Sequence, residues 1–484
     1  MSTEANPSFL LKQNFPFEPT SGQVSLFKKM DDFLLNKDDF GNLCFVIKGY
    51  AGTGKTTVIS TIIKVLPKFG YKAVLLAPTG RAAKVMSVYS RKKAFTIHKK
   101  IYKQVANQYT GNLEFQRQNN YNTKTIFIID EASMIADDAE YGTTGLLSDL
   151  LEYVFTNPEE SHTGNKIIFV GDTAQLPPVG KLSSPALDVN YIKNQFHLGV
   201  AHQELTEVMR QDANSGILFN ATELRNTLIN NNINSSSQKP QIAFTCKGYH
   251  DFYKMTSEKI EDGINYVYKK YGREDSIILT RSNKTAVLYN QYIRQKILYY
   301  EDEINAGDLI MVVRNNYHWL EETSPAGFLA NGDFAEIIKV RGIQEMYGFR
   351  FINLTIRLID YEDHPEIEVK ALMDTLYAHT PTLSREQNKM LYDAVCEDYA
   401  HITLKKDRME AIRKDDYLNA IQIKFAYALT CHKSQGGQWK AVFVDQGYLQ
   451  DDQINEDFVR WLYTAITRAS KEVFLLNFHK DFFE

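Results

Sequence analysis

A glycine-rich segment between two apolar stretches constrains the fold of this chain more than any other feature. Residues 49–56 read Gly-Tyr-Ala-Gly-Thr-Gly-Lys-Thr and complete the pattern GxxxxGK[ST]. The apolar run 43–47 precedes the pattern, and the stretch 57–63 can start a helix, which together give the strand–loop–helix context that the motif requires. The segment predicts a phosphate-binding loop; the alternative is a glycine-rich turn that holds no ligand.

The chemistry of such a loop predicts a nucleoside triphosphate with Mg²⁺ as its ligands. Glycines let the backbone curl so that its N–H groups point at phosphate oxygens, and the following helix adds a favourable dipole. Lys55 would reach the β- and γ-phosphates, and the Thr56 hydroxyl would hold Mg²⁺. The expected nucleotide contacts are Gly49, Ala51, Gly52, Thr53, Gly54, Lys55, Thr56 and Thr57.

Short apolar runs predict strands that are buried on both faces of a parallel sheet. They are rich in β-branched residues and do not alternate with polar ones. In the first 200 residues these runs are 43–47, 73–77, 125–129 and 166–170. Similar runs at 276–280, 441–444 and 473–476 predict a second sheet. We therefore expect an α/β chain with two parallel sheets.

The same runs suggest how the chain divides into domains. We expect a first domain at 1–203, a second formed by 204–299 with 420–484, and an inserted domain at 300–419. Within the insertion, Asn331-Gly332 between strand-like runs predicts a hairpin, and the charged stretch 383–416 predicts helices. The insertion either forms a small barrel that clamps a nucleic-acid strand or serves as a solubilising surface domain.

Composition places any nucleic-acid site in a local groove. The 484 residues carry a net charge of −4, which argues against coating nucleic acid by bulk charge. The four cysteines, Cys44, Cys246, Cys396 and Cys431, are dispersed and lack metal-binding spacing, as in a cytoplasmic protein with reduced thiols. No run of 18 or more apolar residues occurs, so we expect no membrane partner.

Two acidic residues follow the predicted strand 125–129. Asp130 at a strand end suits a Mg²⁺ partner, direct or through water, and Glu131 can polarise an attacking water. A carboxylate pair that caps a helix is the alternative. After the next strand, Gln175 can sense the γ-phosphate and Asp172 can link that sensing to neighbouring elements, unless this segment is only a turn.

The residues around these positions resemble one known family. Asp130-Glu-Ala-Ser-Met134 followed by Gly171-Asp-Thr-Ala-Gln-Leu-Pro-Pro178 is similar to the DNA helicases of superfamily 1, in the branch that contains RecD and the phage helicase Dda. Further motifs of that family occur in order, and the resemblance covers most of residues 17–480. It is weaker in the insertion.

The resemblance assigns roles to residues in the first half of the chain. Thr20-Ser-Gly-Gln23 resembles the motif that reads adenine, with Gln23 as the reader. Pro78 and Thr79 fall in a motif whose backbone lies on single-stranded DNA, and His98 falls in the next element that contacts the strand. Residues 204–211 resemble the motif in which Arg210 would reach the γ-phosphate.

Similar assignments follow near the C-terminus. Residues 427–436 resemble a motif in which Thr430 and His432 would contact DNA and Gly436 would lie near the nucleotide. Gln438 stands where the family often has a glutamate for the nucleotide sugar, which leaves the choice of sugar open. Residues 462–469 resemble the motif that carries the arginine finger, here Arg468. An isolated histidine is also commonly a core residue, and either arginine could form only a surface ion pair.

The resemblance also implies an architecture and an activity. It implies two tandem RecA-like domains, with a pin-like β-hairpin at 99–124 in the first and an SH3-like barrel plus helices in the second. ATP hydrolysis in the cleft between these domains would drive 5′→3′ movement on single-stranded DNA and the unwinding of forked duplex DNA. The motor would be a monomer that serves DNA repair or recombination. Tyr109 and Phe115 are the candidate aromatic residues of the pin.

Two alternatives stay open at this point. A motor of the same fold could act on RNA or on a ribonucleoprotein, and the 2′-hydroxyl is what would distinguish the two substrates. A nucleotide-regulated switch without motor activity would need only one functional α/β core. It would need neither Arg210 nor Arg468.

Overall fold

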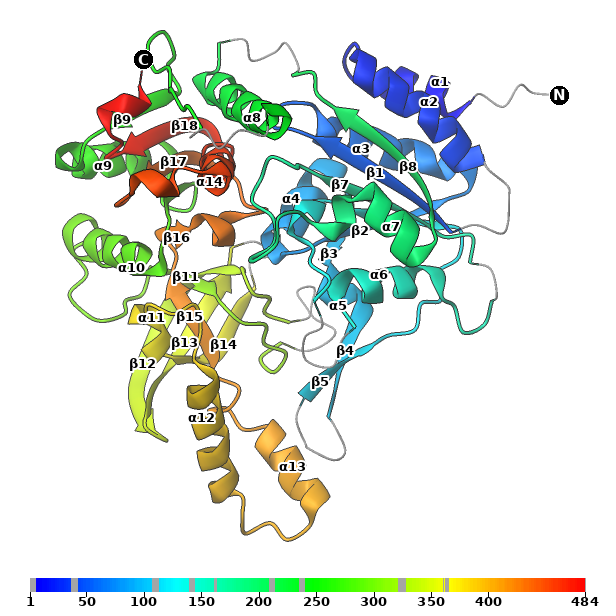
Figure 1. Ribbon diagram of the computed structural model, residues 1–484. Coiled ribbons are helices and arrows are strands. Elements are labelled where there is room, and N and C mark those ends of the chain that lie inside the picture. The colour runs from blue at the N-terminus through cyan, green and yellow to red at the C-terminus, as the bar shows by residue number, and fades with distance from the viewer. Residues whose placement is uncertain are drawn as a thin grey trace. The chain divides into compact units, whose positions relative to one another are not determined.

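The computed structural model describes most of the chain. The described ranges are 6–35, 42–106, 113–138, 144–160, 163–208, 214–234, 240–320, 328–359, 361 and 365–483. These residues gather into two compact units, which are coloured by residue number in Figure 1. The first unit takes residues from 1–78, 82–241 and 455–467, and the second from 79–81, 242–454 and 468–484.

The division differs from the predicted domain boundaries in two places. Residues 204–241 were predicted in the second domain but belong to the first unit, because the last strand of the first sheet continues to Leu205 and its following helix stays with that unit. Residues 455–467 were also predicted in the second domain, yet their helix packs within the first unit. The two compact units therefore group both segments differently from the predicted domains.

A six-stranded parallel sheet forms the centre of the first unit. Its strand order is β3-β2-β6-β7-β1-β8. The strands are β1 (Leu43–Gly49), β2 (Lys72–Ala77), β3 (Ala94–Thr96), β6 (Thr125–Ile129), β7 (Lys166–Gly171) and β8 (Gly199–Leu205). All four apolar runs predicted in this part of the chain are strands of this sheet, and the α/β fold class is confirmed.

Helices cover both faces of this sheet, which explains why its central strands β1, β6 and β7 are mostly apolar. Phe45 and Ile47 of β1 pack in one cluster, whereas Cys44 and Val46 pack in another on the opposite face. The first cluster includes residues of α1 (Pro7–Asn14), α2 (Ser21–Leu35), α3 (Lys55–Val65) and α4 (Gly80–Ser90). The second includes residues of α5 (Ile97–Ile101), α6 (Leu146–Phe155) and α7 (Val189–Phe196).

A two-stranded hairpin leaves the first unit after α5. β4 (Tyr102–Ala106) pairs antiparallel with β5 (Leu113–Arg117), and Gln104 lies opposite Phe115. Figure 1 shows the pair extending away from the six-stranded sheet. This is the hairpin predicted at 99–124. Residue Tyr109 falls at 107–112, which lies outside the described residues.

The second unit contains a five-stranded parallel sheet and a closed barrel. The sheet has the order β16-β10-β17-β18-β9. Its strands are β9 (Phe252–Met255), β10 (Ser276–Thr280), β16 (Ala428–Thr430), β17 (Trp439–Asp445) and β18 (Ala469–Leu476). The three apolar runs predicted for the second sheet all fall within these strands. The helices α9 (Ile260–Tyr271) and α10 (Asn283–Tyr292) follow β9 and β10.

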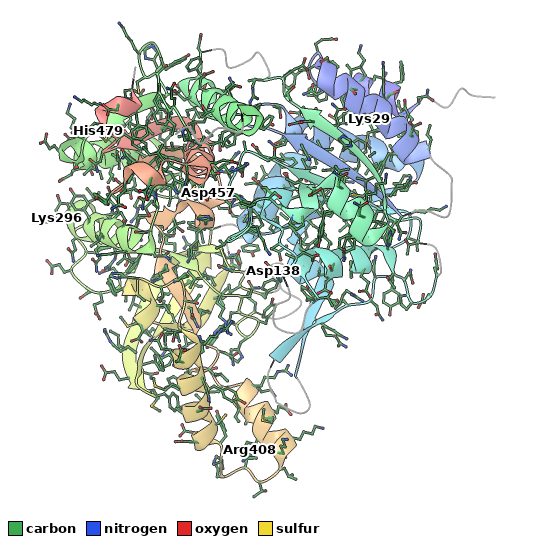
Figure 2. All side chains as sticks on the ribbon, viewed as in Figure 1. Lys29, Asp138, Lys296, Arg408, Asp457 and His479 are labelled. Carbon is green, nitrogen blue, oxygen red and sulfur yellow. The ribbon has the colours of Figure 1, made fainter. Side chains whose placement is uncertain are left out.

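The barrel has five strands, of which the first four lie in the predicted insertion 300–419, whereas the fifth lies just beyond its predicted end. They are β11 (Leu309–Val312), β12 (Phe334–Met346), β13 (Phe349–Leu358), β14 (Glu366–Leu372) and β15 (Ile421–Phe425). The helices α11 (Asp374–Tyr377), α12 (Arg385–Asp398) and α13 (Lys405–Arg413) lie in sequence between β14 and β15. Figure 2 marks α13 by the label on Arg408.

The predicted Asn-Gly hairpin is a turn of another kind. Asn331 and Gly332 form a turn that leads into β12 rather than joining two adjacent strands. The tight hairpin lies instead between β12 and β13, where Tyr347 and Gly348 both have positive φ, at 54° and 76°. Positive φ at both central residues gives the twist that a two-residue hairpin needs. No Asn-Gly signal marks that turn, so the sequence did not reveal it.

Two further helices belong to the first unit and bear on its site. They are α8 (Gly216–Asn234) and α14 (Glu456–Ile466), which contact each other. Figure 2 labels Asp457 at the start of α14. In the described part of the chain, no helix is long and apolar enough to span a bilayer.

Candidate nucleotide-binding site

The predicted phosphate loop joins β1 to α3 in the first unit. Gly52 and Gly54 have φ of 75° and 79°, a conformation that side-chain-bearing residues rarely adopt. A Cβ atom at Gly49 would lie 2.8 Å from Thr53 Oγ1 and 3.0 Å from Lys55 Cγ. Glycine is therefore required at Gly49 for space and at the other two positions for backbone conformation. This is the cradle that the motif predicts.

Lys55 is the first residue of α3 and closes over its own loop. Its Nζ donates to the Gly49 and Tyr50 carbonyl oxygens at 2.7 and 2.9 Å. The same Nζ lies 3.9 Å from Asp172 Oδ2. Thr56 follows on α3 and is exposed, and Thr57 is half-buried. The ammonium group therefore rests on hydrogen bonds that phosphate oxygens could replace.

Gln23 lies beneath the phosphate loop rather than on the surface. Its side chain is fully buried, and its Nε2 donates to the Thr53 carbonyl oxygen at 3.1 Å. Its Oε1 accepts from the Thr20 backbone N–H at 3.0 Å. Glu207, beyond β8, accepts from Ser21 Oγ and the Gly22 backbone N–H and so holds the start of α2. Gln23 thus couples the start of α2 to the phosphate loop.

Asp130 and Glu131 lie directly after β6, at the same edge of the sheet as the phosphate loop. Asp130 accepts from Tyr89 Oη at 2.7 Å and from the Glu131 backbone N–H at 2.9 Å. Burial, and then the neighbouring Glu131 charge, raise the pKa of Asp130 to about 6. Glu131 has φ 51° and ψ 37°, a left-handed conformation that costs about 1 kcal/mol or more for a non-glycine residue. Such strain often marks functional residues.

The raised pKa of Asp130 predicts a pH-dependent gain in stability for Asp130→Asn. In the unfolded chain the pKa of this carboxyl group is near 3.8. Between about pH 4 and 6 the folded state therefore binds more protons than the unfolded state does. The free energy of unfolding accordingly falls as the pH rises through that window. A neutral asparagine avoids this loss, so the variant should have a free energy of unfolding about 2 to 3 kcal/mol higher than the wild type at pH 7. Thermal unfolding without Mg²⁺ at pH 4.5 and at pH 7 measures the difference. An equal gap between variant and wild type at both pH values would contradict it.

A tyrosine from the C-terminal motif completes the site, and sequence reasoning did not single it out. Tyr463 on α14 is 1% exposed. Its hydroxyl donates to Asp172 Oδ2 at 2.7 Å and accepts from the Ala51 backbone N–H at 2.8 Å. The next residue of α14, Thr464, accepts a hydrogen bond at its Oγ1 from the Leu176 backbone N–H at 2.8 Å. One helix therefore holds both the phosphate loop and the segment after β7.

We expect Tyr463→Phe to lower both ATP hydrolysis and stability. The change leaves Asp172 and the Ala51 N–H without their shared partner in a buried place, at a cost of about 1 to 3 kcal/mol. Hydrolysis should fall about tenfold, because the loop and Asp172 lose their common tether. Steady-state ATPase and urea unfolding measure the two effects. The control is Tyr191→Phe, which removes a hydroxyl that donates to Asp137 at 3.1 Å. Equal losses of ATP hydrolysis in both variants would contradict the role of Tyr463 as the tether between the phosphate loop and Asp172.

Gln175 carries a buried oxygen atom that indicates which kind of ligand the site would accept. Its side chain is 6% exposed, and among the described residues its Oε1 has no hydrogen-bond partner. A buried carbonyl oxygen without a donor is costly, and a ligand-bound water or hydroxyl can supply the missing donor. Together with the glycine cradle and the hard oxygen donors of Thr56 and Asp130, this fits a nucleoside triphosphate with Mg²⁺.

The other predicted phosphate residues belong to the second unit or fall outside the described residues. Arg210 lies at 209–213, which is not described. Arg468 lies in the second unit, is 3% exposed, and donates to the Gly437 carbonyl oxygen at 3.3 Å. Gly436 has φ 75° and lies in the second unit, as does Gln438, which is exposed. Their nucleotide roles stay predictions.

The predicted DNA-contacting residues are divided between the units. Pro78 directly follows β2 and belongs to the first unit, whereas the neighbouring Thr79 groups with the second unit. Thr430 ends β16, and the exposed His432 follows it in a short 3₁₀ helix. His98 lies on α5, and burial lowers its pKa to about 4, so it is neutral at physiological pH. Any role of His98 toward phosphate would therefore use a neutral imidazole.

Two protein families match this sequence. The AAA domain family matches residues 39–243, and the UvrD-like helicase C-terminal domain family matches residues 425–476. The first match contains the phosphate loop, Asp130, Glu131 and Asp172. The second match includes α14, the helix that the structure places in the first unit.

Curated proteins with similar sequences come from viruses, bacteria and an archaeon. An uncharacterized protein of Acanthamoeba polyphaga mimivirus, R530, is 27% identical over 89% of this chain and 94% of its own length. The ATP-dependent DNA helicase dda of Enterobacteria phage T4 is 25% identical over 88% of this chain and 93% of its own. The RecBCD enzyme subunit RecD of Buchnera aphidicola is 25% identical over 89% of this chain and 70% of its own.

Proposed function

We propose that this chain, which is an ATP-dependent DNA helicase of superfamily 1 in the RecD/Dda-like branch, moves 5′→3′ along single-stranded DNA and unwinds the duplex ahead of it. The observation that carries the proposal is the cluster at one edge of the first sheet. There Lys55 and Asp172 lie 3.9 Å apart, and Tyr463 joins Asp172 to the phosphate loop. ATP is the proposed energy source.

The residues of this cluster suggest a division of labour in hydrolysis. Lys55 would neutralise phosphate charge, and the loop N–H groups would hold the phosphates. Thr56 and Asp130 would hold Mg²⁺, which neutralises the charge that develops on the phosphates. Glu131 would accept a proton from the attacking water, and the Gln175 side-chain amide would orient that water or sense the γ-phosphate.

The direction of movement and the choice between DNA and RNA are best tested with matched substrates. Wild-type hydrolysis should rise with single-stranded DNA, and forked duplexes with a 5′ tail should unwind while those with only a 3′ tail do not. A non-hydrolysable ATP analogue is the control for unwinding. Stimulation by RNA instead of DNA would favour the ribonucleoprotein alternative, and unwinding from the 3′ tail would overturn the proposed polarity.

The proposal extends to the setting of the motor. We expect a monomer in solution that works in a reducing, cytoplasm-like compartment. The four cysteines support the compartment because all are free thiols and two of them, Cys44 and Cys431, are buried. Sedimentation with and without a single-stranded oligonucleotide tests the monomer, and a dimer in both conditions would contradict it.

A further inference from the structure

A cavity of about 400 Å³ lies in the first unit beside the base of the β4–β5 hairpin. It is lined by Phe95, Lys99, Lys100, Gln118, Asn119, Tyr121, Asn122 and Tyr153. These residues come from β3, α5, α6 and the segment after β5. β3 is an edge strand of the sheet, whereas the nucleotide cluster lies at the ends of β1, β6 and β7. The cavity is therefore separate from the ATP site.

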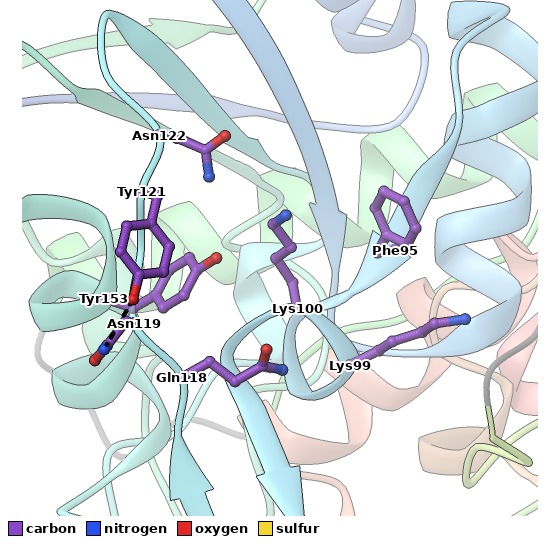
Figure 3. Close-up of a pocket in the computed structure, with 8 residues that line it drawn as sticks. All are labelled: Phe95, Lys99, Lys100, Gln118, Asn119, Tyr121, Asn122 and Tyr153. Carbon is purple, nitrogen blue, oxygen red and sulfur yellow. Dashed lines mark hydrogen bonds between the residues drawn. The ribbon is translucent and has the colours of Figure 1, made fainter. Parts of the chain in front are cut away.

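The lining combines aromatic rings, amides and cationic groups without a carboxylate. Figure 3 shows Lys100 between the ring of Phe95 on one side and the rings of Tyr121 and Tyr153 on the other. Lys99 and Lys100 Nζ lie 6.0 and 5.9 Å from the Phe95 ring centroid. Tyr121 is 59% exposed, so one wall of the cavity is an open aromatic face.

Lys100 is placed as an anion-binding group. Among the described residues it forms no ion pair, and burial alone lowers its pKa. A partly desolvated ammonium without a carboxylate favours an incoming anion, since that anion restores the interaction lost with water. Lys93, whose Nζ lies 5.4 Å from the Phe95 centroid, adds to the local positive charge. This is a local basic site in a chain whose net charge is −4.

We propose that this cavity binds one nucleotide of a nucleic-acid strand, with its base against the aromatic rings and its phosphate at Lys100. Rings and amides that surround a base, with a lysine for its phosphate, are the chemistry by which proteins hold single strands without reading their sequence. The inference rests on the proposed DNA motor function. Two sources share this chemistry, namely the strand on which the motor runs and the strand displaced beside the β4–β5 hairpin.

Binding of three fluorescent DNAs to the full chain tests the cavity. They are a single strand, a duplex with one 5′ tail, and a fork that also carries the displaced arm. Tyr121→Ala should weaken binding about five- to hundredfold, and Tyr121→Phe should restore it. Lys100→Gln should lower the slope of log affinity against log salt by about 0.7 to 0.9, as expected for one lost phosphate contact. Lys68→Gln, at an exposed lysine of the 3₁₀ helix Leu66–Phe69, should leave the slope unchanged.

Each result of this experiment decides something about the cavity. Losses confined to the fork would support the cavity and assign it to the displaced strand, whereas losses with all three DNAs would assign it to the tracked strand. Wild-type affinities and salt slopes in Tyr121→Ala and Lys100→Gln, together with normal DNA-stimulated hydrolysis, would overturn the cavity alone. Failure of the wild type to bind any of the DNAs would overturn both the cavity and the motor.

Discussion

We expect Glu131→Gln to hydrolyse ATP about 10²- to 10⁴-fold more slowly than the wild type while binding ATP normally. The carboxylate is proposed to take the proton of the attacking water, and loss of a positioned general base has an effect of this size. Glutamine keeps the shape of the side chain and tolerates the left-handed backbone at this position, with φ 51°. The variant should therefore fold and bind as before.

Single-turnover hydrolysis and titration with a fluorescent ATP analogue separate the two effects. Glu18→Gln serves as the control, because Glu18 is exposed and lies before α2. Loss of binding in parallel with loss of hydrolysis would mean that Glu131 supports the shape of the site rather than the chemical step. Full activity would remove Glu131 from the mechanism and leave Asp130 as the remaining candidate base.

Replacing Lys55 by alanine should lower hydrolysis about 10²- to 10³-fold and also weaken ATP binding. The ammonium lies 3.9 Å from Asp172 Oδ2 and donates to two carbonyl oxygens of the glycine cradle, and removing one preorganised donor from such a site costs that much. Both the ground state and the transition state lose a charge partner. We therefore expect both kcat and KM to change, unlike in Glu131→Gln.

The matched control for this substitution is on the same helix. Lys64 lies on the exposed face of α3, so Lys64→Ala should leave hydrolysis unchanged. DNA-stimulated ATPase at several ATP concentrations distinguishes kcat from KM. If Lys55→Ala retained wild-type hydrolysis, the glycine-rich turn would not be a phosphate site, and the motor proposal would fail with it.

Much of the fold could be predicted because its determinants are local. Buried parallel strands favour nearly continuous apolar runs, so runs such as 125–129 and 276–280 stand out in the sequence. The phosphate loop is equally local, since Gly49, Gly52 and Gly54 are fixed by close approach or positive φ. Asp130 and Glu131 could be placed because they directly follow an apolar strand.

The parts that could not be predicted depend on contacts between distant segments. Tyr463 reaches Asp172 across 291 positions of sequence, and no local pattern reports such a pairing. The burial of Gln23 beneath the loop and the hydrogen bond from Tyr89 to Asp130 are of the same kind. The predicted boundary at 203 differs from the division into compact units because β8 pairs with β1, which lies more than 150 residues earlier. The pocket beside β3 also unites four separate elements.

The position of α14 has a consequence for how truncated forms of this protein should be interpreted. A gene fragment that stops at residue 241 would encode every strand of the first sheet and the whole phosphate loop. It would lack residues 455–467, and with them the tyrosine and threonine that contact Ala51, Asp172 and Leu176. A stop codon anywhere before residue 455 therefore removes part of the catalytic unit itself. Nonsense alleles between residues 241 and 455 should therefore behave as losses of ATP hydrolysis, and not merely as losses of the second unit.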